Sequence, residues 1–184
     1  QTVAVFCGSK PGTSPAFLQW AKKAGEVLAH NDLALVYGGA RSGLMGVLAD
    51  AALEAGGEVI GVMPDNLEKQ ERIHQGISQL ISVKDMSERK EKMLALSDGC
   101  IALPGGTGTL DEIFEAITLS QLGVHKKPCA FLNIEGFYDP LHKFLQHAQD
   151  QGFIHPDYFD MLIFSDDLQN MLSRMRDFKH PHQY

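Results

Sequence analysis

The sequence has 184 residues, of which 44% are hydrophobic, and its formal net charge at pH 7 is −7. This length and composition are typical of one globular domain with a substantial buried core. The excess of acidic residues argues against broad binding to nucleic acid or to an anionic membrane surface. No stretch is long and apolar enough to predict a membrane span. This composition still allows a local basic site for a small phosphate.

The three cysteines and eight histidines show no pattern typical of a disulfide framework or a metal site. Cys7, Cys100 and Cys129 each lie in or beside an apolar run, and an odd number without framework spacing favours reduced thiols in the cytoplasm. We expect them to be buried apolar residues rather than nucleophiles. The histidines form no helical pair and no cluster with cysteine, so no metal is predicted. We also expect no signal peptide, because the chain enters a strand-like run at once.

The chain opens with a strand, a loop and a helix. Residues 2–7 are rich in β-branched and aromatic side chains and predict a strand, which a turn-rich loop containing Gly8 and Ser9 follows. The loop is not a P-loop, because its second glycine comes too early and no Lys-Ser/Thr pair follows. Pro15 favours a helix start, and the helix is expected to run to about residue 31. Its expected core face is Phe17, Trp20, Ala21, Ala24, Val27 and Leu28.

A glycine-rich turn follows the second predicted strand, residues 33–37. Gly38, Gly39 and Gly43 precede a predicted helix over residues 44–55, which Gly56 ends. The glycines do not follow the order of a dinucleotide-binding fingerprint, and no acidic residue ends the strand to hold a ribose diol. A Rossmann-type dinucleotide site is therefore not favoured.

The region after the third predicted strand, residues 58–63, is polar and irregular as far as residue 80. It contains Glu71, and a connection of this length is either a binding lid or a surface excursion. A short strand is predicted at residues 81–83. A helix then runs to about residue 97, with Asp85 or Ser87 as its N-cap.

Arg89 and Lys90 occupy an unusual position, the first turn of that helix. The helix dipole disfavours cations there by ~0.3–1 kcal/mol each. A solvated charged face is one explanation. A bound anion is the other, because it would reverse the penalty, and arginine can bind a phosphate through two hydrogen bonds.

The stretch from Cys100 to Ile117 combines a short buried strand at residues 101–103, a glycine-rich turn and a helix start. Such a turn presents free backbone N–H groups, and the helix dipole favours negative charge there. Glu112 is expected in the first turn of the helix, beside the anion. An alternative is that Thr109 and Glu112 form a capping box, a purely structural role. The spacing by itself does not decide between these two interpretations.

The rest of the chain continues the alternation. The predicted elements are the end of that helix near residue 123, a strand at 129–132, a turn at 133–136, a helix at 137–149, a loop at 152–160, a strand at 161–164, and a helix at 166–175 capped by Ser165. The pattern predicts one Rossmann-like, doubly wound α/β domain over residues 1–178, with a mainly parallel sheet and a frayed tail at 179–184. Its ligand would lie beyond the carboxyl ends of the strands, where the loops after strands one, two and five converge.

Two motifs, one at residues 86–90 and one at residues 104–112, resemble those of a known family. They are Met86-Ser87-Glu88-Arg89-Lys90 and Pro104-Gly105-Gly106-Thr107-Gly108-Thr109-Leu110-Asp111-Glu112. The second resembles the PGGxGTxxE signature of the Lonely Guy family, the cytokinin riboside 5′-monophosphate phosphoribohydrolases, which are often labelled lysine decarboxylases. The segments 37–46 and 136–138 are also similar, so the resemblance covers nearly the whole chain.

The resemblance implies a Rossmann-like homodimer that hydrolyses the N-glycosidic bond of a nucleoside monophosphate without a cofactor. It implies catalytic roles for Arg89 and Glu112. The implied ligand-binding residues, with those of the converging loops, are Gly8, Ser9, Gly39, Glu71, Met86, Lys90, Gly105, Gly106, Thr107, Gly108 and Thr109. Two departures from the family pattern are Ser87, where histidine is usual, and Ala40-Arg41, where glycine is common at the first position.

We expect Glu112 to stabilise positive charge on the ribose or to activate water, while the phosphate positions the sugar. A second hypothesis is a non-catalytic carrier of a phosphorylated nucleotide or cofactor, using the same pocket. A decarboxylase would need a Schiff-base lysine and pyridoxal phosphate, and nothing in the sequence singles out such a lysine. The resemblance leaves two candidate bases, adenine and N6-prenylated adenine.

Overall fold

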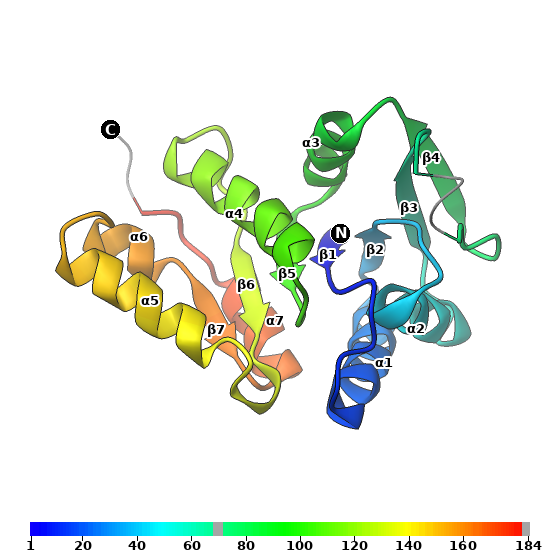
Figure 1. The fold of residues 1–184 in the computed structure, drawn as a ribbon, viewed down its shortest axis with the longest axis horizontal. Coiled ribbons are helices and arrows are strands. Elements are labelled where there is room, and N and C mark those ends of the chain that lie inside the picture. Colours follow the sequence, from blue (N-terminus) through cyan, green and yellow to red (C-terminus); the bar gives the residue numbers. More distant parts are fainter. Residues whose placement is uncertain (68–71, 182–184) are drawn as a thin grey trace.

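The computed structural model describes residues 1–67 and 72–181, in which strands and helices alternate (Figure 1). The strands are β1 (Thr2–Phe6), β2 (Ala34–Tyr37), β3 (Val59–Pro64), β4 (Gln79–Val83), β5 (Gly99–Ala102), β6 (Cys129–Leu132) and β7 (Ile163–Ser165). The helices are α1 (Pro15–His30), α2 (Gly43–Glu54), α3 (Met86–Leu96), α4 (Thr107–Gln121), the short 3₁₀ helix η1 (Ile134–Gly136), α5 (Asp139–Asp150), α6 (Pro156–Asp160) and α7 (Leu168–Arg176).

The strands form one sheet in the order β4-β3-β2-β1-β5-β6-β7, and every neighbouring pair is parallel. The chain starts at the centre of the sheet with β1 and winds outward to β4. It then returns to place β5 on the other side of β1 and winds outward to β7. This confirms the predicted doubly wound fold and locates its switch point between β1 and β5, where such sheets bind ligands.

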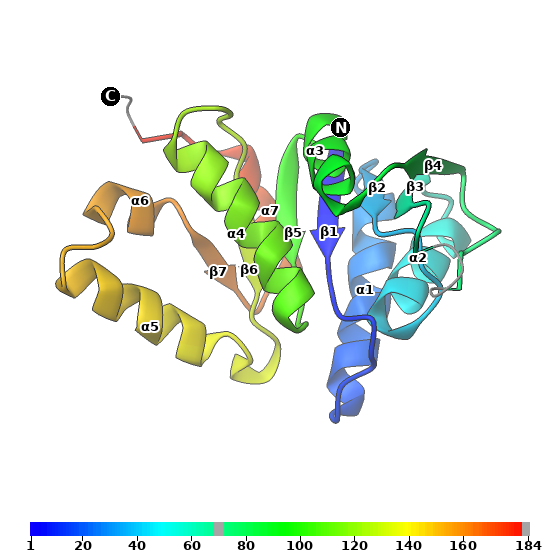
Figure 2. The ribbon, with the colours of Figure 1, turned by 45° about the horizontal axis from the view of Figure 1, so that its top comes forward.

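Helices cover both faces of the sheet, as Figure 2 shows. Side chains of β1 alternate between the two resulting cores: Val3 and Val5 pack with α1, α2 and α7, whereas Ala4 and Phe6 pack with α3, α4 and α5. A strand that is buried on both faces is apolar at every position, which explains the unbroken hydrophobic run at residues 3–7. No helix within the described residues has the length and apolar character needed to cross a bilayer.

Several predicted boundaries shift in the C-terminal third because side chains extend the turns. Helix α5 begins at Asp139, two residues after the predicted start. The Asn133 side chain extends the preceding turn, because it accepts a hydrogen bond from the Tyr138 backbone N–H and donates one to the Asp139 carboxylate. The loop predicted at residues 152–160 contains the short helix α6. Helix α7 is capped by Asp167 rather than Ser165, because the Asp167 carboxylate accepts from the Asn170 N–H at 2.7 Å.

The predicted tail, residues 179–184, lies only partly within the described residues, since 182–184 fall outside them. His180 Nε2 lies 2.9 Å from the Ser120 carbonyl oxygen, so this part of the tail contacts the C-terminal half of α4. All three cysteines are buried and free, which confirms their predicted burial.

Candidate active site

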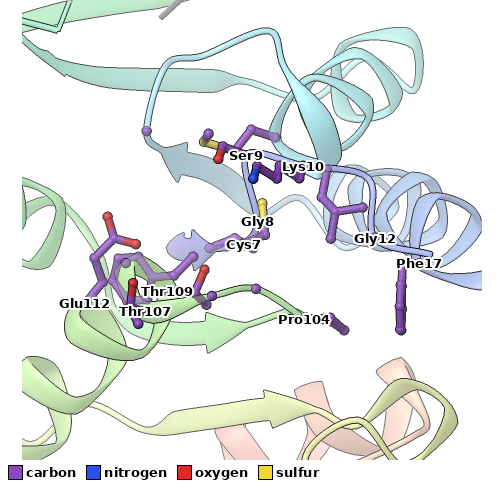
Figure 3. A pocket seen from close by; sticks show the side chains of 18 of the residues that line it. Cys7, Gly8, Ser9, Lys10, Gly12, Phe17, Pro104, Thr107, Thr109 and Glu112 are labelled. Atoms are coloured by element: carbon purple, nitrogen blue, oxygen red, sulfur yellow. The ribbon is translucent and has the colours of Figure 1, made fainter. Parts of the chain in front are cut away.

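A cavity of about 500 Å³ lies at the carboxyl edge of the sheet, at the switch point between β1 and β5. The loops after β1, β2 and β5 and the N-terminal parts of α2, α3 and α4 line it, so the three glycine-bearing loops converge as predicted. Figure 3 shows Glu112 at one side of the cavity and Phe17 at the other, with Ser9 and Lys10 between them on the β1 loop. This volume is typical of a site for a small molecule.

The N-terminus of α4 opens onto this cavity. Gly106 is its N-cap and has no side chain with which to cap the first amides of the helix, which belong to Thr107, Gly108 and Thr109. These residues also line the cavity. Amides that have no intrahelical partner, together with the positive end of the helix dipole, favour an anion at this place.

The position of this helix start excludes the capping box. Because α4 begins at Thr107, Thr109 is its third residue and Glu112 its sixth, in the second turn rather than the predicted first turn. A capping box needs the threonine at the N-cap and the glutamate three residues on, inside the first turn. Glu112 therefore lies outside the capping-box position, and its half-buried side chain lines the cavity.

Gly105 permits the close approach of the β5 loop to α4. A Cβ at this position would collide with the Thr109 side chain and would lie 3.0 Å from the Gly8 amide nitrogen. Thr109 is itself buried, so it has little room to move. At Gly108, by contrast, an added Cβ would have no neighbour within 4 Å.

This contrast predicts different results for two glycine substitutions. We expect Gly105→Ala to lower the free energy of unfolding by ~1–3 kcal/mol through overpacking. The matched control Gly108→Ala should leave stability unchanged or raised by ~0.4–1 kcal/mol, because alanine is the better helix former. If its Cα faces a bound phosphate, Gly108→Ala should still raise KM for a phosphorylated ligand. Urea unfolding and steady-state kinetics measure the two effects.

The loop after β1 is hydrogen-bonded both to the β5 loop and to the start of α2. The Gly8 N–H donates to the Pro104 carbonyl at 3.1 Å, and the Gly8 carbonyl accepts from the Leu44 N–H at 3.1 Å. Gly8 therefore links the β5 loop to the start of α2. Gly8 and Ser9 both line the cavity, as predicted.

Arg89 is buried, with 4% of its surface exposed, and its guanidinium reaches back to the sheet. Nε donates to the Val62 carbonyl at 2.9 Å and Nη2 to the Gly38 carbonyl at 2.6 Å. Both carbonyls are neutral, so these hydrogen bonds fix the guanidinium without cancelling its charge. Since Arg89 also lines the cavity, it provides positive charge there, which favours an anionic ligand. Gly38 admits the guanidinium, because a Cβ at Gly38 would collide with Nη2.

Lys90, the next residue, points elsewhere. Its ammonium forms salt bridges with Asp111 at 3.0 Å and with Glu115, both on α4. These contacts raise the pKa of Lys90, chiefly through the hydrogen bond to Glu115, so the side chain is charged at neutral pH. Lys90 is not among the residues that line the cavity.

Three predicted ligand-binding residues remain: one lines the cavity, one does not, and one lies outside the described residues. Met86 lines the cavity, and its sulfur lies 3.6 Å from Arg89 Nη1. Gly39 does not line it; its φ is +79°, and its carbonyl accepts a hydrogen bond from the His74 N–H at 3.0 Å. Glu71 lies outside the described residues.

Sequence reasoning did not assign Phe17 and Phe137 to the cavity. Their rings meet edge to face at 5.7 Å, although the residues are 120 positions apart, and both line the cavity. The Tyr138 hydroxyl beside them donates to the Leu103 carbonyl at 2.6 Å, and burial raises its pKa, so it remains a donor. The sequence signal that could have identified Phe137 was the resemblance of residues 136–138 to the family.

Cys7 also lines the cavity, but we do not expect its thiol to act as a nucleophile. Burial, and then the nearby charge of Glu112, raise the pKa of this thiol well above its usual range. Because only a thiolate is an effective nucleophile, we expect Cys7→Ala to keep turnover within about threefold of the wild type. Steady-state kinetics test this, and a loss of more than about a hundredfold would contradict it.

Within the described residues, no group of three or more His, Cys, Asp or Glu side chains could hold a metal ion. The cavity thus offers an anion site at the start of α4, a buried arginine and a carboxylate. This set can bind a phosphate and stabilise positive charge close to it.

Comparison with known proteins identifies the family. A family described as "Possible lysine decarboxylase" matches residues 45–175. A protein named cytokinin riboside 5′-monophosphate phosphoribohydrolase from Rhodococcoides fascians is 45% identical over 177 residues, which cover 96% of this chain and 89% of that protein. The chain belongs to the Lonely Guy family. An Arabidopsis thaliana member named for the same activity is 38% identical over 181 residues, covering 98% and 85% of the two chains.

Solved structures share the fold at lower identity. The molybdenum cofactor carrier protein of Chlamydomonas reinhardtii is 24% identical with a TM-score of 0.71, and 96% of each chain is covered. A molybdenum cofactor binding protein from Rippkaea orientalis is 20% identical with the same TM-score, over 96% of this chain and 95% of that one. At these identities the likeness between the carrier proteins and this Lonely Guy protein shows the fold alone.

Proposed function

We propose that this protein hydrolyses the N-glycosidic bond of a nucleoside 5′-monophosphate to release the free base and ribose 5-phosphate. One observation carries the proposal: the N-terminus of α4, whose N-cap is a glycine, and the Glu112 carboxylate, five residues after the first residue of the same helix, line one cavity. The names of the relatives at 45% and 38% identity support this substrate class.

In this mechanism the phosphate binds at the amides of Thr107, Gly108 and Thr109. Its binding energy, remote from the reacting atoms, then positions the sugar. Cleavage breaks the bond between C1′ and the base nitrogen, and positive charge develops on the ribose as in other glycosidic hydrolyses. Glu112 stabilises this charge and accepts a proton from the attacking water, whose oxygen forms the new bond to C1′.

Arg89 supplies the complementary charge. Its guanidinium is fixed by the carbonyls of Gly38 and Val62, so it needs no reorganisation when the anion binds. It holds the nucleotide and favours departure of the base. The base leaves with its electron pair and takes up a proton from solvent, while Glu112 returns to solvent the proton that it accepted from the attacking water. We place Gly8, Ser9, Met86 and Gly105–Thr109 in contact with the ligand.

Incubation with a panel of nucleoside monophosphates tests the proposal. We expect AMP or N6-prenylated AMP to yield free base and ribose 5-phosphate in equal amounts, measured by chromatography. Nucleosides without the phosphate should react far more slowly, because they lack the binding group. Tight nucleotide binding without any release of base would instead favour the carrier function.

We also propose that the protein works in the cytoplasm as a homodimer, bound neither to a membrane nor to nucleic acid. The three buried, free thiols and the net charge of −7 support this setting. Phe144 and Phe153 are large apolar side chains that are 64% and 87% exposed in the single chain, which supports a partner surface. Light scattering should give twice the 20.2 kDa of one chain.

A further inference from the structure

Lys90 connects the two helices that carry Arg89 and Glu112. Its ammonium lies 3.0 Å from the Asp111 carboxylate and also pairs with Glu115, and only 16% of its side chain is exposed. Asp111 and Glu115 are four residues apart on α4, so they lie on the same face of the helix. Without a cation between them, these two carboxylates would repel each other.

Two of the residues in these contacts are sequence neighbours of the proposed catalytic residues. Lys90 follows Arg89 directly on α3, and Asp111 directly precedes Glu112 on α4. A link between Lys90 and Asp111 therefore joins the two helices at positions adjacent to both residues. Arg89 itself is tied to the sheet through Gly38 and Val62, so the link holds α4 relative to an already fixed group.

The geometry points to Lys90 as a positioning residue that sets the spacing between Arg89 and Glu112, and we propose this role in place of a contact with the ligand. The inference rests on the proposed function. Misplacing a reacting group by about 1 Å can cost ~10²-fold in rate. Loss of the link should therefore reduce kcat, while the phosphate still binds the amides of α4 and KM changes little.

The first test is Lys90→Met, which keeps most of the apolar stem but removes the charge. We expect kcat for an active nucleoside monophosphate to fall by ~10-fold or more, with KM within ~3-fold of the wild type. Lys90→Arg, which can still bridge both carboxylates, should recover most of kcat. The matched control is Lys92→Met, an exposed lysine of the same helix, which should behave as the wild type.

The second test removes the other half of the link. The double variant Asp111→Asn, Glu115→Gln leaves Lys90 in place but without carboxylate partners. We expect the same loss of kcat as in Lys90→Met, and no additional loss when the three substitutions are combined, because all of them break one interaction. If Lys90 contacts the ligand instead, this double variant should keep kcat or lower KM.

Two results would overturn the positioning role: an unchanged kcat in the double variant, or a KM that rises tenfold or more in Lys90→Met while kcat is retained. Thermal unfolding of each variant shows that the fold is intact. A wild-type protein that cleaves no nucleoside monophosphate would overturn the proposed function and the positioning role together. An active wild type with unaffected variants overturns the positioning role alone.

Discussion

Glu112→Gln is expected to slow release of ribose 5-phosphate by at least ~10²-fold, the usual contribution of a positioned acid or base. The glutamine side chain has nearly the same shape and can still form hydrogen bonds, but it can neither carry negative charge nor accept a proton from water. Single-turnover kinetics with saturating nucleotide measure the effect on the chemical step directly.

The same substitution should leave stability nearly unchanged. Glu112 is the sixth residue of α4, beyond the capping-box position, and glutamine keeps the length and hydrogen-bonding groups of the side chain. Glu91→Gln, at an exposed position of α3, is the matched control and should change neither rate nor melting temperature. Wild-type turnover in Glu112→Gln would exclude Glu112 from the chemistry.

Arg89→Lys should lower both stability and activity, although it conserves the charge. A lysine lacks the planar fork that lets Arg89 donate to the Val62 and Gly38 carbonyls at once. Loss of one hydrogen bond to a charged group should cost ~1.5–3 kcal/mol. For a protein of this size that corresponds to a fall of ~3–12 °C in melting temperature. We also expect kcat/KM to fall ~10²-fold, because the fixed cation moves away from its place in the cavity.

Gly38→Ala provides an independent check, because it changes the position of Arg89 without altering that residue. The new Cβ would occupy the place of Nη2, so the guanidinium must leave the Gly38 carbonyl. The two variants should therefore share a lower melting temperature and a lower kcat/KM. Full activity and stability in both would show that the geometry of Arg89 is unimportant.

Local sequence patterns determined most of the fold. The run of apolar residues at 129–132 matches β6 at both ends, and Pro15 opens α1 as predicted. The anion-binding turn after β5 was also visible, because glycines, a preceding strand and a following helix all lie within about 20 neighbouring residues. These signals act on the backbone nearby and need no distant partner.

Tertiary structure decided what the individual side chains do. Whether Thr109 and Glu112 cap a helix depended on where α4 begins, and the packing of Thr109 against Gly105 accompanies the start at Thr107. Arg89 and Lys90 look alike in the sequence, yet one binds carbonyls 27 and 51 positions earlier and the other binds carboxylates 21 and 25 positions later. Such partners are brought together only when the sheet assembles, so spacing along the chain could identify the residues of the site but not their separate roles.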